Sequence, residues 1–135
     1  MINFQIQSKF KLTQKRKIKK WLNYIAKTEG FEIGILSYLF VNDDKMCEYN
    51  KKYLNHNSLT DIITFEIKEN KKISGDVIIS TERVLENAKK FNVTFTNELY
   101  RVMVHGLLHL LGYNDKKVKE KEEIRKKENH YLKNI

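Results

Sequence analysis

The sequence predicts an α/β fold, in which about four strands form one mixed sheet, mainly parallel with one antiparallel strand, packed against about five helices. Strand-like and helix-like hydrophobic patterns alternate through the first half of the chain, as in parallel sheets with helical crossovers. Two strand patterns then follow each other across a short polar segment, as in an antiparallel hairpin. A later helical stretch is apolar on all sides, as expected of a central, buried helix.

The first two elements are predicted from periodicity and capping residues. Apolar residues alternate over Ile2–Ile6, which predicts a strand. Thr13 can cap a helix that runs to about Thr28 and stops at Gly30. One face of that helix is apolar, with Ile18, Trp21, Leu22 and Ile25. Its other face is basic, which is typical of a solvated helix face as well as of an RNA-binding one.

The next strand and helix are also predicted from the hydrophobic pattern and from capping residues. Ile33–Val41 has the pattern of a buried strand, and Asn42 or Asp43 can cap a second helix. Three residues of this helix are expected to point inward, namely Met46, Tyr49 and Tyr53. The polar residues 55–58 that follow predict a loop.

A hairpin and a third helix come next. Ile62–Ile67 and Ile73–Ile79 have strand patterns and are joined by a polar turn at residues 69–72. Ser80 or Thr81 then begins a helix. Its expected inward residues are Val84, Leu85, Ala88 and Phe91.

Two helices complete the chain. The apolar helix is predicted to begin at Thr96 and to end at Gly112, and a charged helix covers residues 116–133. The charged helix is weakly amphipathic through Val118, Ile124 and Leu132. The apolar helix also carries a candidate functional site, described next. We expect four leucines of this helix to wall that site, namely Leu107, Leu108, Leu110 and Leu111.

That site is predicted from residues 105–115. His105 and His109 are four residues apart, which places both imidazoles on one helix face. Gly112 is suited to end the helix, and Asp115 can fold back as a third ligand. The spacing is that of the metzincin zinc signature, with two changes: Gly106 stands where those enzymes carry a glutamate base, and Asp115 replaces the third histidine.

Three protein ligands predict one divalent metal, with zinc preferred, and an open position for a catalytic water. The same ligand set also suits ferrous iron. The alternative interpretation is that the two histidines are core residues, each bonded to a backbone carbonyl.

The same string resembles the motif of the YbeY family of bacterial endoribonucleases, H-G-x-L-H-L-x-G-Y-D-H. Here Asn114 stands for the family aspartate and Asp115 for its last histidine. A second similar block comprises Leu59–Phe65 and Ser74–Ser80. Where the family has Tyr-Arg, this chain has Tyr53-Leu54, so the family arginine is absent. The resemblance covers about residues 30 to 117.

The resemblance implies a zinc-dependent endoribonuclease specific for single strands. It also implies a role in ribosomal RNA maturation, at the 3′ end of 16S rRNA, and in ribosome quality control. The expected partners are therefore single-stranded RNA, ribosomal RNA and ribosomal particles, and residues 1–135 are expected to form one metallohydrolase domain.

Further candidate residues each have a second interpretation. His56, beside the Thr60-Asp61 pair, could act as acid, base or phosphate donor, or be an exposed loop residue. Asp61 and Asp76 could orient a metal ligand, or instead cap turns.

A cation must replace the absent arginine at the phosphate. Arg83, Lys51 and Lys52 are candidates for this role. The alternative interpretation, which we favour, is that Arg83 is an exposed helix residue.

Composition narrows the class of protein. The 135-residue chain carries 26 basic and 17 acidic residues, a net charge of +9, which suits a polyanionic partner. One cysteine excludes an intrachain disulfide, and no signal peptide or membrane span is apparent, so we expect a cytoplasmic protein.

Three functional classes follow: a metal-dependent endoribonuclease, a zincin-like hydrolase of peptides, and a non-catalytic RNA- or ribosome-binding protein with a structural metal. Gly106 argues against the peptidase, because glycine cannot act as a base.

Overall fold

The computed structural model describes residues 1–54, 59–69 and 72–135. Within this part of the chain, four strands form one sheet in the order β1-β2-β4-β3: β1 (Ile2–Ile6), β2 (Glu32–Val41), β3 (Ile62–Glu69) and β4 (Lys72–Ser80). β2 is parallel to both β1 and β4, whereas β3 is antiparallel to β4. The predicted mixed sheet and hairpin are confirmed, although the 55–58 loop and the centre of the 69–72 turn lie outside the described residues.

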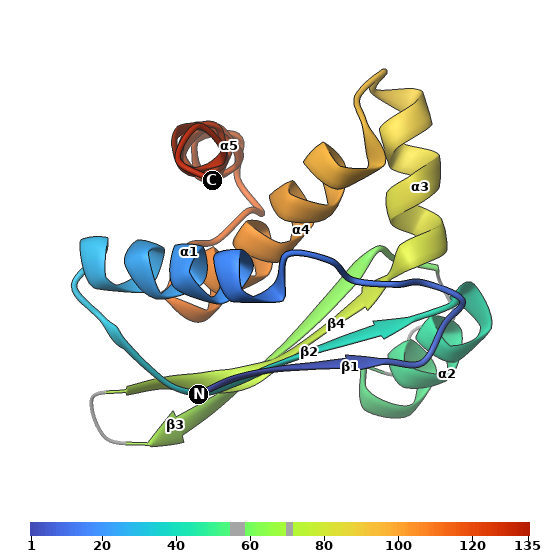
Figure 1. The fold of residues 1–135 in the computed structure, drawn as a ribbon, viewed down its shortest axis with the longest axis horizontal. Helices are drawn as coiled ribbons and strands as arrows, with labels where there is room; N and C mark the ends of the chain where they lie inside the picture. The colour runs from blue at the N-terminus through green and yellow to red at the C-terminus, as the bar shows by residue number, and fades with distance from the viewer. Residues whose placement is uncertain (55–58, 70–71) are drawn as a thin grey trace.

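The same part of the chain contains five helices: α1 (Lys15–Thr28), α2 (Asp43–Leu54), α3 (Thr81–Lys90), α4 (Phe95–Leu110) and α5 (Val118–Leu132). In Figure 1, α1, α3, α4 and α5 lie on one side of the sheet, and α2 lies at one end of it. None of the described helices is long and apolar enough to cross a membrane.

Side chains on the two faces of the sheet pack in two different hydrophobic clusters. Leu36, Tyr38 and Phe40 of β2 belong to the main core, together with the apolar faces of α1 and α4. Val41 instead packs in a smaller cluster with Met46 of α2. Because strand side chains alternate in direction, β2 contributes to both cores.

Two predicted helix starts are wrong and two are confirmed. Asn42 accepts a hydrogen bond from the Lys45 N–H, and Ser80 accepts one from the Arg83 N–H, as N-caps do. Helix α1, however, starts after Gln14, which has a positive φ of 60° and no side-chain cap, so Thr13 is not its cap. Helix α4 is capped by Thr94, two residues before Thr96, because Thr94 has the extended backbone that an N-cap requires.

Some residues expected to point inward are exposed instead. Tyr53, Leu85, Phe91 and Val118 are 51%, 42%, 53% and 73% exposed. Each lies on, or directly after, a helix that buries only a narrow strip of side chains. Helix α3, which ends just before Phe91, buries Thr81, Val84 and Ala88. Helical periodicity identifies an apolar face but not how wide a strip the neighbouring elements cover.

Gly106 allows the central helix α4 to lie close to the sheet. A Cβ atom at this position would be 2.8 Å from Val77 Cγ1 and 2.9 Å from Ile62 Cδ1, closer than side chains normally approach. A glutamate at this position would therefore point into the sheet. The packing gives a physical reason why α4 carries glycine where zincin-like enzymes carry their base.

Helix α5 is held to α1 by Glu29, whose side chain is only 10% exposed. The carboxylate accepts hydrogen bonds from the Tyr113 and Tyr131 hydroxyls and from Lys127. Burial alone would raise the pKa of Glu29, but the three donors outweigh it, so the pKa lies below its ordinary value of 4.5. Trp21 Nε1 also donates to the Tyr131 carbonyl, at 2.9 Å.

We expect Glu29→Gln to lower the free energy of unfolding at pH 7 by about 1–3 kcal/mol, because a charged acceptor for three donors is lost. Since the folded pKa is lowered, the contribution is present above about pH 4.5 and is lost as the pH falls through the folded value. Urea unfolding of both proteins between pH 3 and 7 measures this difference. A difference that stays constant across this range would contradict the assignment.

Candidate metal centre

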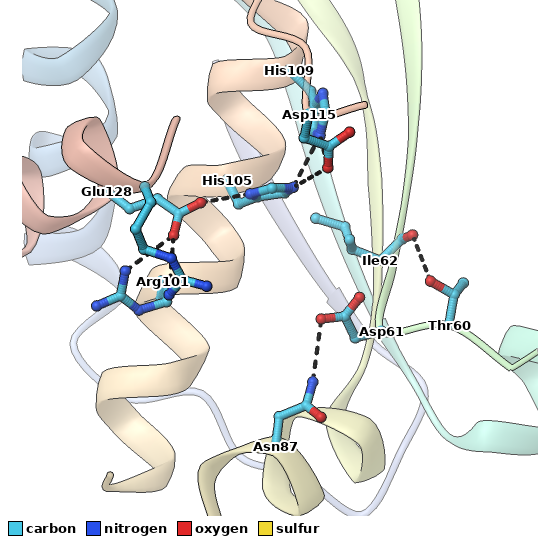
Figure 2. A network of polar contacts seen from close by, with 10 residues as sticks. Thr60, Asp61, Ile62, Asn87, Arg101, His105, His109, Asp115 and Glu128 are labelled. Carbon is cyan, nitrogen blue, oxygen red and sulfur yellow. Dashed lines mark hydrogen bonds and ion pairs between the residues drawn. The ribbon is translucent and has the colours of Figure 1, made fainter. Parts of the chain in front are cut away.

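The three predicted ligands converge at the C-terminal end of α4. His105 and His109 lie one turn apart on the helix, and their Nε2 atoms are 2.9 Å apart. Gly112 ends the helix with a φ of 109°, so the chain turns back. This turn brings Asp115 Oδ2 to 3.3 Å from His105 Nε2 and 3.2 Å from His109 Nε2. Figure 2 shows the three side chains pointing toward one another.

The geometry of this group fits a divalent cation. One potential ligand atom from each residue lies within 4.8 Å of the others. Their side chains are 21%, 23% and 41% exposed, so the group is open to solvent on one side. Two imidazole nitrogens and a carboxylate oxygen are common zinc ligands, and a set of three leaves a further coordination position open.

The other ring nitrogen of His105 is bonded to a helix that lies much later in the sequence. Glu128 Oε2 of α5 lies 2.6 Å from His105 Nδ1, and Glu128 Oε1 accepts from Arg101 at 3.0 Å. Burial opposes charging of the His105 ring, but the Glu128 carboxylate outweighs it, so the pKa of His105 is raised. Burial likewise opposes the charge on Glu128, yet bonding to His105 and Arg101 lowers its pKa.

A cleft of about 350 Å³ lies beside this group. His105 and Asp115 line it together with several charged or polar residues: Asp61, Asn87, Glu98, Arg101, Lys121, Arg125 and Glu128. Asn87 donates to Asp61 Oδ2 at 3.4 Å, and burial raises the pKa of Asp61, partly offset by nearby His105. The four leucines expected to wall the site do not line this cleft. All four are buried in the main core.

Of the other predicted site residues that the structure describes, only one lies at the cleft. Asp61 lines the cleft. Arg83 does not, because its Nε donates to both oxygens of Asp43, at 3.1 and 3.2 Å. Lys51 and Lys52 are exposed on α2, outside the cleft. Asp76 borders a different pocket, formed with residues such as Tyr49 and Tyr53, and His56 lies outside the described residues.

The sequence analysis did not identify four charged residues that line the cleft, namely Arg101, Lys121, Arg125 and Glu128. Two signals could have identified part of this group. Arg101 precedes His105 by four residues, which places it on the same face of α4. Glu128 stands between Ile124 and Tyr131 at helical spacing, so an acid occupies the buried strip of α5. An acid at such a position needs a partner inside the protein.

The fold and site together define an α/β protein with a candidate metal centre on a buried helix. The family model described as Endoribonuclease YbeY matches residues 1–135. Similar curated proteins, both named Endoribonuclease YbeY, come from Cytophaga hutchinsonii and Flavobacterium johnsoniae. The first is 46% identical over 130 residues, covering 96% of this chain and 91% of that protein. The second is 43% identical over 132 residues, covering 98% and 95%.

A solved structure agrees with these matches. The solution structure of TM1509 from Thermotoga maritima superposes with a TM-score of 0.71 and 30% identity, covering 98% of this chain and 87% of that one. The chain belongs to the endoribonuclease YbeY family.

Proposed function

We propose that residues 1–135 act as one metallohydrolase domain that cuts single-stranded RNA and holds one divalent ion, zinc, at His105, His109 and Asp115. The observation that carries this proposal is the convergence of three ligand atoms beside a cleft that also contains cationic side chains. The names of the curated relatives support RNA as the substrate. The family resemblance supports ribosomal RNA, including the 3′ end of 16S rRNA, with ribosomal particles as partners and the cytoplasm as the compartment.

Bound at these ligands, the ion would supply Lewis acidity that activates water and stabilises charge on the phosphate. Asp61 is suited to accept a proton, because its partly buried carboxylate faces the cleft and has a raised pKa. Asn87 would hold Asp61 in place through the hydrogen bond to Oδ2. The peptidase alternative lacks its base, because position 106 faces the sheet.

The test is cleavage of one RNA sequence, presented as a single strand and as a duplex, by zinc-loaded protein. We expect the single strand to be cut, the duplex to resist, and a chelator to stop the reaction until zinc is added back. Zinc-loaded protein that binds the single strand without cutting it would overturn the proposal in favour of an RNA-binding protein with a structural metal.

Arg125 is the best-placed cation for the RNA phosphates. Its side chain is 57% exposed, and its NH1 is 3.8 Å from Glu128 Oε1, so the guanidinium is only loosely held in the cleft. Lys121 lines the same cleft. Arg83 is unsuited to this role, because Asp43 neutralises it away from the cleft.

We expect Arg125→Ala to raise KM for single-stranded RNA about fivefold, the loss of roughly 1 kcal/mol from one phosphate contact. The dependence of binding on salt should weaken by about one counterion. Steady-state cleavage at two salt concentrations measures both effects, with Arg83→Ala as the matched control and metal content as a check. An equal rise of KM in the two variants would contradict a specific role for Arg125.

A further inference from the structure

We propose that Glu128 is a positioning residue of the metal centre, which makes the C-terminal helix α5 part of that centre. The inference rests on the proposed function only in requiring a metal at His105, His109 and Asp115. It assigns no reaction step to Glu128. Its role would be to orient the His105 ring and to select the tautomer of that ring that can bind the metal.

The hydrogen bond between Glu128 and His105 determines which nitrogen of the His105 ring carries the proton. Glu128 Oε2 lies 2.6 Å from His105 Nδ1, and a carboxylate at this distance accepts a hydrogen bond from an Nδ1–H group. The proton on Nδ1 leaves the lone pair of Nε2 free. That nitrogen is the one facing His109 Nε2 and Asp115 Oδ2 (Figure 2). A carboxylate that holds the far nitrogen of a metal-binding histidine typically strengthens metal binding.

The carboxylate is itself fixed in place. The Glu128 side chain is only 4% exposed, and the Arg101 side chain that donates to its Oε1 is 19% exposed. Arg101 and His105 lie one turn apart on α4, so a single carboxylate spans both residues (Figure 2). The ion pair with Arg101 also offsets the free-energy cost of burying the negative charge of Glu128. Without a partner, a buried carboxylate would destabilise the fold.

Helix α5 is anchored so that Glu128 keeps its position. Ile124 and Tyr131 are buried on the same face of α5 as Glu128. Tyr131 is tied to α1 through the Trp21 and Glu29 hydrogen bonds. The rigid placement of α5 is therefore transmitted to the His105 ring through one short hydrogen bond.

The competing explanation is that Glu128 only docks α5 through its ion pair with Arg101. The two explanations differ in a measurable way. A docking residue affects the stability of the fold, and the metal affinity of the folded protein stays unchanged. A positioning residue affects the metal affinity of protein that is still folded.

The experiment is titration of metal-free protein with Zn²⁺ against a chelating indicator, for wild type, Glu128→Gln and Glu128→Asp. Circular dichroism restricts the comparison to folded protein. We expect Glu128→Gln to lower zinc affinity by about 10- to 100-fold, the range typical for lost partners of metal ligands. The Co²⁺-substituted variant should also show an altered visible spectrum. Glu128→Asp, which keeps the charge on a shorter side chain, should lose less affinity and remains informative if the glutamine variant does not fold.

The matched control is Glu122→Gln, an exposed glutamate on the same helix, which should bind zinc like wild type. Unchanged zinc affinity and Co²⁺ spectrum in folded Glu128→Gln would overturn the positioning role and leave the proposed function intact. Wild-type protein that binds no zinc would overturn the proposed metal site, and with it this inference.

Discussion

His109→Ala is expected to abolish metal retention and RNA cleavage together, with a fall in cleavage rate of about 10³-fold or more, because two remaining ligands hold zinc weakly. The His109 side chain is 23% exposed and faces the other ligands, so its truncation should leave the main core intact. The measurements are the zinc-to-protein ratio by elemental analysis and single-turnover cleavage of single-stranded RNA. Circular dichroism should confirm that the variant is folded.

The matched control is His130→Ala, which removes an exposed histidine of α5 and should keep both zinc and activity. Cleavage at the wild-type rate by folded, zinc-free His109→Ala would contradict the proposed mechanism and would point to a contaminating nuclease.

Two substitutions of the candidate third ligand, Asp115, are expected to differ in their effect on zinc binding. Asp115→Ala should weaken zinc binding by about 100-fold or more, because a charged ligand is removed from a set of three. Asp115→His should retain the metal, since it supplies the ligand type that the family motif carries at this position. The Asp115 side chain is 41% exposed, so an imidazole has room there.

Competition titration with a chelating indicator measures zinc affinity in both variants and in wild type. Equal zinc occupancy in wild type and Asp115→Ala under limiting zinc would show that Asp115 is not a ligand. Loss of zinc from Asp115→His alone would show that the turn after Gly112 cannot place a longer side chain at the site.

The elements of the fold were predictable where the signal is local. Alternation along β1, the buried-strand pattern of β2, the hairpin pattern, the Ser80 cap and the Gly112 stop all depend on residues close in sequence, and the structure confirms them. The errors occur where packing decides the outcome. Whether Phe91 is covered depends on neighbouring elements, which helical spacing does not specify.

The residues proposed for the site from the sequence fall into the same two groups, those set by local geometry and those set by packing. His105, His109 and Asp115 fall within one helix and the turn that follows it, so helical geometry and a glycine stop were enough to predict their convergence. Arg83 was one candidate for the phosphate cation, but its Nε donates to Asp43, which lies 40 residues away along the chain. No local pattern indicates that this charge is already neutralised.

The sequence by itself determined the α/β class, the helix that carries the histidines and the turn that returns Asp115 to them, because these depend on backbone geometry over a few residues. Only the tertiary structure decided what surrounds the ligands. Glu128 is 23 residues from His105 in sequence, and it reaches Nδ1 because α5 packs across α4. Burial makes that contact specific, because a carboxylate removed from water is stable only where the fold places a positively charged or hydrogen-bonding partner beside it.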